Sequence, residues 1–110
     1  AADGTAKKRT TPLASGLSNP DSLCLDAAGN LYIGVTTGVQ VMTPDGKKVK
    51  LIPINAPAGS CTISGVTNCT FGGDDGKTLY MTTWTTIWKI DDMPIPGLDW
   101  LVGQKRAQCQ

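Results

Sequence analysis

Short apolar or alternating runs, separated by turn-forming residues, make up most of the chain between positions 23 and 90. Gly and Asn adopt the positive φ that tight hairpins need, and the pair Asp45-Gly46 is a strong hairpin signal. The pattern therefore predicts four strands joined by three tight turns, which form one up-and-down antiparallel sheet. The predicted strands are Leu23–Leu25, Leu31–Val35, Val39–Met42 and Val49–Ile52.

A second group of strands follows a long connection rich in Pro, Gly, Ser and Ala. The predicted strands are Thr67–Phe71, Thr78–Thr83 and Thr86–Ile90. No fourth strand is expected there, because Pro94, Pro96 and Gly97 break regular structure. A further strand is predicted before the first group, over Lys8–Leu13.

The two groups read as one structural unit written twice. Leu31 and Tyr32 match Leu79 and Tyr80 at an offset of 48, and Cys24 is matched to Cys69 at an offset of 45. Repeats of roughly 40 to 50 residues built from short strands are typical of propeller blades. A blade needs neighbours to bury its faces, and two blades are too few to close a ring. The chain is therefore expected to be part of a larger assembly.

The predicted fold is all-β, with about two four-stranded antiparallel blades of a β-propeller. Residues 1–19 are interpreted as an edge strand and the loop that enters the first blade. A blade over 20–53, a loop over 54–66, an incomplete blade over 67–92 and an irregular tail over 93–110 complete the division.

Two features of the composition restrict the chemistry. The chain has no His, and all nine acidic residues are Asp. It cannot by itself build a Ser-His-Asp triad or a His-ligated zinc site, whereas oxygen ligands suit cations such as calcium or magnesium. The net charge of +1 gives no reason to expect nucleic acid or an anionic membrane as a partner. No apolar run approaches the roughly 18 residues of a membrane-spanning helix.

The four cysteines fall into two groups. Cys24 and Cys69 stand among apolar neighbours and are predicted to be buried strand residues, because a thiol behaves as a small hydrophobe. Cys61 and Cys109 can form a disulfide in an oxidising compartment, or one of them can pair with another part of the protein. The cysteine content favours a periplasmic or secreted location over a cytoplasmic one.

Three segments resemble a known family. The stretch Asn19–Tyr32 reads Asn-Pro-Asp-Ser-Leu-Cys-Leu-Asp-Ala-Ala-Gly-Asn-Leu-Tyr. It resembles the gluconolactonase, senescence-marker-protein and luciferin-regenerating-enzyme family, in which Pro-Asp-Gly precedes an apolar run, an Asp and a turn. The segment Thr67–Tyr80 resembles the next blade, and Ile95–Leu98 is similar to the family's usual ending. The resemblance covers about residues 3 to 98 and assigns them to the C-terminal portion of the propeller.

The resemblance implies a six-bladed propeller whose central funnel holds one divalent metal. Calcium is the favoured metal, and zinc, magnesium and manganese are the alternatives. The Asp of the family's Pro-Asp-Gly is a metal ligand and candidate general base, and it corresponds to Asp21; from the sequence alone, Asp21 can equally cap the turn after Pro20. Ser22 replaces the family's Gly. Asn19, Ser22 and Asn68 are expected near the funnel mouth, as substrate contacts or neighbours of the metal.

Three functions stay open at this point. The favoured one is part of a metal-dependent hydrolase of lactones or related esters, inactive as this chain alone. Its other blades would lie on another chain or on further copies of this one, and its substrate would be a small-molecule lactone. The second is a non-catalytic binding or scaffold propeller, which Ser22 favours. The third is a two-blade fragment that assembles into a ring with copies of itself.

Overall fold

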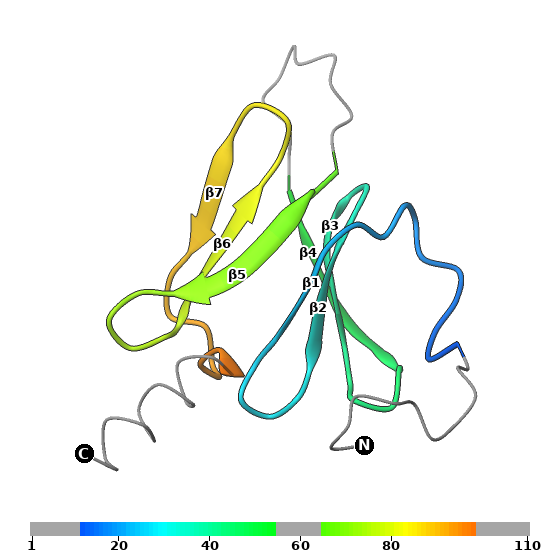
Figure 1. Cartoon of the computed structure of the whole chain (residues 1–110), viewed down its shortest axis with the longest axis horizontal. Coiled ribbons are helices and arrows are strands. Elements are labelled where there is room, and N and C mark those ends of the chain that lie inside the picture. Colours follow the sequence, from blue (N-terminus) through cyan, green and yellow to red (C-terminus); the bar gives the residue numbers. More distant parts are fainter. Residues whose placement is uncertain (1–11, 55–64, 99–110) are drawn as a thin grey trace, which may run out of the picture.

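The computed structural model describes residues 12–54 and 65–98, which form two antiparallel sheets (Figure 1). The first sheet consists of β1 (Leu23–Leu25), β2 (Leu31–Val35), β3 (Gly38–Met42) and β4 (Lys48–Pro53), in that order. The second consists of β5 (Asn68–Gly72), β6 (Thr78–Thr82) and β7 (Ile87–Ile90). The all-β prediction is confirmed, and these strands agree with the predicted ones to within two residues at each end. Of the strand predicted before them, positions 8–11 lie outside the described residues.

Glycine at positive φ closes the predicted hairpins. Gly29 (φ 84°) lies in the turn between β1 and β2, and its N–H donates to the Asp26 carbonyl at 3.0 Å. Gly46 (φ 88°) does the same between β3 and β4, donating to the Thr43 carbonyl at 2.9 Å. Both residues have the left-handed backbone conformation that glycine adopts without a steric cost.

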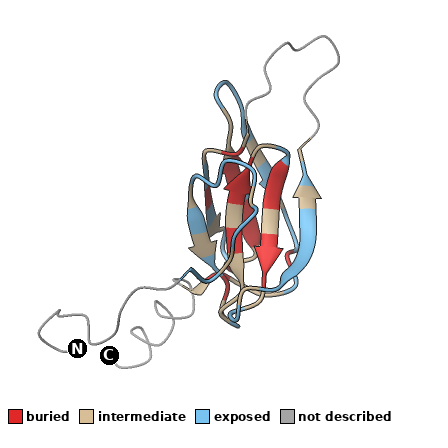
Figure 2. Cartoon of the chain, turned by 90° about the vertical axis from the view of Figure 1, so that its right-hand side faces the viewer, coloured by how far each residue is buried: buried red, intermediate tan, exposed pale blue. Residues whose placement is uncertain are grey.

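The two sheets pack face to face, with β5 against β1 and β2 (Figure 1). Buried residues concentrate on the middle strands, whereas β4 is largely exposed (Figure 2). Gly34 allows the chain at Val66 to approach the first sheet closely, because a Cβ at position 34 would lie 2.4 Å from the Val66 carbonyl oxygen. The core between the sheets contains Tyr32, Val39, Val41, Val66, Cys69, Leu79, Met81 and Met93.

Strand register corrects one match in the repeat. Cys24 lies opposite Tyr32 in the first sheet, and Thr70 lies opposite Tyr80 in the second. Since Tyr32 and Tyr80 are equivalent, the equivalent of Cys24 is Thr70, so its match to Cys69 was wrong. The two cysteines therefore lie on opposite faces of their own sheets, and both face the interface between them.

The same register shows that the first sheet has an open apolar face, formed by Leu23, Leu25, Leu31, Ile33 and Leu51, although Val35 and Met42 on the same side of the sheet are buried. The equivalents of its first four residues in the second sheet are Cys69, Phe71, Leu79 and Met81. Those four pack against the first sheet, whereas Leu23 is 55% exposed. This surface is therefore covered in the second blade and only partly covered in the first. The outward face of the second sheet is more polar, with Asn68, Thr70, Thr82 and Lys89.

Residues 93–98 connect the turns of both sheets. The Met93 and Gly97 N–H groups donate to carbonyls in the turn between β5 and β6, at 2.9 and 3.0 Å. The Ala27 N–H, in the turn between β1 and β2, donates to the Pro96 carbonyl at 2.7 Å. Gly97 lies so close to Phe71 that an added Cβ would come within 2.4 Å of the Phe71 Cβ. This segment therefore holds the two sheets together at one end.

We expect the isolated chain to self-associate through the open apolar face, because monomers rarely expose large contiguous apolar patches. The double substitution Leu23→Lys and Leu51→Lys should shift the chain toward monomer in sedimentation velocity. Ile87→Lys is the control, because Ile87 is 74% exposed but lies on the more polar outward face of the second sheet. A monodisperse monomer of the unsubstituted chain would contradict the expectation.

Candidate functional site

Asp21 lies immediately before β1 on a fixed backbone. Its N–H donates to the Gly34 carbonyl at 3.0 Å, and the Gly34 N–H donates to the Ser22 carbonyl at 3.0 Å. Asp21 is exposed, and no described residue donates a hydrogen bond to its carboxylate. The carboxylate is therefore not engaged in capping the turn after Pro20, and it is available to a ligand.

The other three predicted site residues differ in their surroundings. Asn19 is exposed and has a left-handed backbone conformation with φ 48°. The Ser22 hydroxyl is buried and has no hydrogen-bond partner of ordinary geometry among the described residues, although it lies close enough to Cys69 to lower the pKa of that thiol. Asn68 is exposed at the start of β5. The side chains of Asn19, Asp21 and Asn68 make no hydrogen bond with one another.

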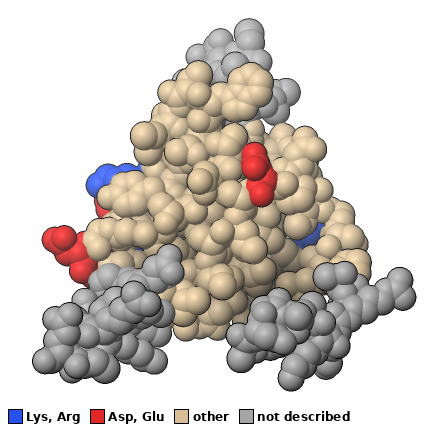
Figure 3. Space-filling model, viewed as in Figure 1, with Lys and Arg blue, Asp and Glu red and all other residues tan. Residues whose placement is uncertain are grey.

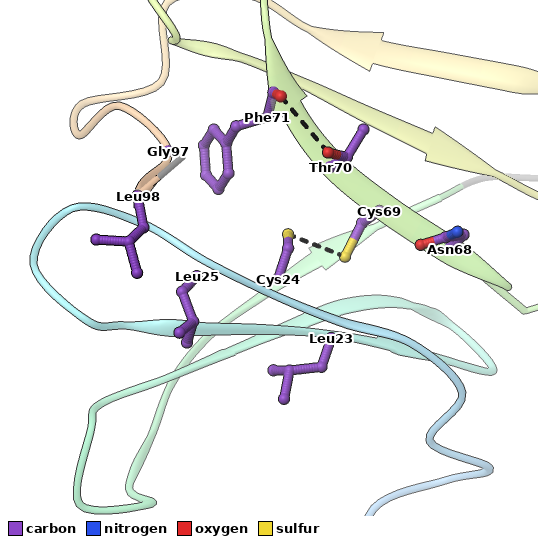
Figure 4. Close-up of a pocket in the computed structure, with 9 residues that line it drawn as sticks. All are labelled: Leu23, Cys24, Leu25, Asn68, Cys69, Thr70, Phe71, Gly97 and Leu98. Atoms are coloured by element: carbon purple, nitrogen blue, oxygen red, sulfur yellow. Dashed lines mark hydrogen bonds between the residues drawn. The ribbon is translucent and has the colours of Figure 1, made fainter. Parts of the chain in front are cut away.

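A pocket of about 390 Å³ lies between β1 and β5 (Figure 4). Leu23 and Asn68 lie toward one end of it, and Leu25 and Phe71 toward the other. Leu23 begins β1 and Asn68 begins β5, so the two strands start at the same end of the pocket. Asp21 and Ser22 directly precede Leu23 in the sequence. The lining consists of Leu23, Cys24, Leu25, Asn68, Cys69, Thr70, Phe71, Gly97 and Leu98.

Comparison with known proteins identifies the family. Residues 1–85 match the family model described as "SMP-30/Gluconolactonase/LRE-like region". The chain belongs to this family. It is 31% identical over 67 residues to proteins named regucalcin from Danio rerio and from Xenopus laevis, a match that covers 58% of this chain and 20% of each relative.

A solved structure supports the same assignment. It is an X-ray structure of a protein provisionally described as a gluconolactonase, with a TM-score of 0.61 and 34% sequence identity. The match covers 74% of this chain and 25% of that one. The two sheets are therefore adjacent blades of a gluconolactonase-like propeller, and the chain spans about a fifth to a quarter of the length of these relatives.

The described residues do not form a complete metal site. Over residues 12–54 and 65–98, no three His, Cys, Asp or Glu side chains gather where they could hold a metal ion. Asp21 is exposed, and its carboxylate is an oxygen donor. The candidate disulfide between Cys61 and Cys109 also lies outside the described residues.

Charged side chains are few on the face shown in Figure 3. Most of the surface in this view is formed by uncharged residues, and an acidic and a basic side chain lie against each other at one edge. The two ion pairs within the described segments, Lys47–Asp45 at 3.7 Å and Lys89–Asp91 at 3.0 Å, are largely exposed. Among the described residues, no helix is long and apolar enough to cross a membrane.

Sequence reasoning missed the position of Asp26. Asp26 lies in the turn between β1 and β2, where its carboxylate accepts from the Ala28 N–H at 2.9 Å and the Asn30 N–H at 3.0 Å. It also accepts from the Asn30 side-chain amide at 2.9 Å and the Tyr32 hydroxyl at 3.2 Å, and Asp26 is fully buried. The spacing Asp-x-x-Gly-Asn-x-Tyr is the signal that could have predicted this network.

The network changes how Tyr32 titrates. Burial, followed by the charge of Asp26 and the hydrogen bond to it, raises the pKa of Tyr32 to about 12. An unfolded tyrosine loses its proton near pH 10, so between about pH 10 and 12 the folded state binds more protons than the unfolded state. This contribution to stability is complete below pH 10 and is lost as the pH rises toward 12.

We therefore expect the free energy of unfolding to fall between about pH 10 and pH 12, and to fall less steeply in Tyr32→Phe. Urea denaturation across this range measures both slopes. Tyr80→Phe is the control, because Tyr80 is 38% exposed on the outward face of the second sheet. Identical slopes for the unsubstituted chain and Tyr32→Phe would show that Tyr32 does not carry the effect.

Asp26→Ala should lower the free energy of unfolding by about 2–3 kcal/mol, because it leaves the buried Tyr32 hydroxyl and three part-buried donors of the turn without an acceptor. Asp45→Ala is the matched control: Asp45 accepts a hydrogen bond from Thr43 in the turn between β3 and β4, but the bond is exposed. Its loss should cost less than about 1 kcal/mol. Equal losses in the two variants, measured by chemical denaturation, would exclude a special role for the buried carboxylate.

Proposed function

We propose that this chain supplies two adjacent blades of a metal-dependent hydrolase that acts on lactones or related esters, and that Asp21 faces the central funnel. The observation that carries the proposal is the Asp21 carboxylate, which is exposed and accepts no hydrogen bond from a described residue. Its backbone is held by the ladder between β1 and β2. Family membership and the description of the solved relative support hydrolysis of a cyclic ester.

A bound divalent cation would polarise the carbonyl of the ester as a Lewis acid and lower the pKa of bound water. Calcium is the favoured cation, and zinc, magnesium and manganese are the alternatives. Asp21 suits one ligand position, because its carboxylate is a hard oxygen donor. It also suits the general base, because a free carboxylate can accept a proton from water. Asn68 and Asn19 can donate hydrogen bonds to substrate oxygens, whereas the Ser22 hydroxyl is buried beside Cys69.

The rest of the propeller should cover the open apolar face. The equivalent face of the second sheet is buried against the first, so a preceding blade would bury Leu23 and Leu25 in the same way. These blades would lie on another chain or on further copies of this one. The same proposal includes a small-molecule lactone as the substrate and a periplasmic or secreted location. It includes neither nucleic acid nor a membrane as a partner.

In the complete assembly, Asp21→Asn should reduce turnover by at least about a hundredfold, the lower range for loss of a general base. The affinity for the metal should fall too, because an anionic ligand becomes neutral. The assay uses the whole particle, a panel of sugar and aryl lactones, and added calcium, zinc or manganese. Calorimetric titration measures metal affinity.

Asp45→Asn is the control, because Asp45 is exposed in the turn between β3 and β4, and it should change turnover little. Full activity of Asp21→Asn would remove the main support for the proposal. An assembly that binds lactones but turns none over with any of these metals would instead favour the non-catalytic propeller.

A further inference from the structure

Two thiols meet across the interface between the blades. Cys24 Sγ on β1 and Cys69 Sγ on β5 lie 3.2 Å apart and point toward each other (Figure 4). A covalent S–S bond is about 2.05 Å long, so a side-chain movement of roughly 1 Å would bring the sulfurs to bonding distance. The residues are 45 positions apart in the sequence and belong to different sheets.

Both sulfur-bearing residues line the pocket of about 390 Å³ between β1 and β5. Cys24 is half-buried, whereas Cys69 is only 4% exposed. The pocket gives a small oxidant a route to the two thiols, while burial protects Cys69 from larger reagents. The pair is thus accessible to a small oxidant and shielded from larger reagents.

We propose that Cys24 and Cys69 form a reversible disulfide between the two blades when a two-electron oxidant such as hydrogen peroxide enters this pocket. The Cys69 thiolate attacks one peroxide oxygen, which breaks the O–O bond, forms a sulfenic acid and releases water after proton uptake. The Cys24 sulfur then displaces the hydroxyl group, and a second water leaves. In total, two thiols and one peroxide give one disulfide and two waters.

The surroundings favour Cys69 as the attacking sulfur. The hydrogen bond from Cys24 lowers the pKa of the Cys69 thiol, as does the nearby Ser22 hydroxyl, while burial acts in the opposite direction. A more acidic thiol has a larger fraction of the reactive thiolate at neutral pH. Cys24 lies next to the sulfenic acid that forms on Cys69, so the Cys24 sulfur can react with it directly to form the disulfide.

Metal binding by this pair is less favoured. A structural zinc site needs four ligands, and no third His, Cys, Asp or Glu joins the two thiols among the described residues. A disulfide needs only the two sulfurs. Its formation would fix β1, the strand that Asp21 precedes, to β5 of the next blade. The proposal does not depend on the proposed hydrolase activity.

The test uses the full chain in its native assembly with Cys61→Ser and Cys109→Ser, which leaves only the proposed pair. The folded protein is treated with hydrogen peroxide, its thiols are blocked, and it is digested with trypsin. Peptide 10–47, which contains Cys24, should be joined to peptide 51–77, which contains Cys69. The joined mass should be about 2 Da below the sum of the two, and dithiothreitol should separate them.

The matched control adds Cys24→Ser to the same background. Peroxide should then leave Cys69 as a sulfenic acid, because the resolving thiol is gone, and dimedone should label it when the protein is unfolded in its presence. The oxidised pair should also raise the melting temperature by several degrees, since the crosslink restricts the unfolded chain.

Three results would overturn the proposal. Both cysteines could be recovered as blocked thiols after peroxide treatment of the folded protein. The joined peptides could form only in denaturant, which would mean that the native geometry does not favour the bond. The joined peptides could also resist dithiothreitol, which would exclude a reversible disulfide.

Discussion

A β-sheet has two faces, and the arrangement of this chain follows from the need to bury both of them. Between the two blades this requirement is met by a shared apolar layer in which Val39 and Leu79 are fully buried. Gly34 brings the second blade close, because a side chain at that position would collide with the Val66 backbone. Contacts that are distant in the sequence, including the cysteine pair and the 93–98 segment, depend on this packing.

The buried network around Asp26 shows how one turn can support both the fold and the candidate site. A carboxylate removed from water must be satisfied by hydrogen bonds, and here backbone, amide and phenol groups all supply them. The network fixes the backbone conformation of the turn that joins β1 to β2. Because the ladder between these two strands also holds the backbone of Asp21, the position of the exposed carboxylate depends on the buried one.

The strands could be predicted because their signals are local: alternation of apolar residues and Gly at the turns. The interface between the blades could not be predicted, because it depends on strand register. In the sequence, Cys24 and Cys69 look like equivalent residues, and only the pairing of Cys24 with Tyr32 and of Thr70 with Tyr80 shows that they are not. Asp21 was proposed as a site residue through a resemblance, whereas the burial of Asp26 required the structure.

The link between Asp26 and Gly97 has a consequence for how the chain folds. These residues form an antiparallel bridge, although the whole second sheet lies between them in the sequence. Closing so long a loop costs chain entropy before any contact is gained, so hairpins form early and this bridge forms late. We therefore expect the first turn to complete its hydrogen bonds only after the second sheet has docked. Such a chain is expected to fold cooperatively, with both blades gaining their final stability in one step.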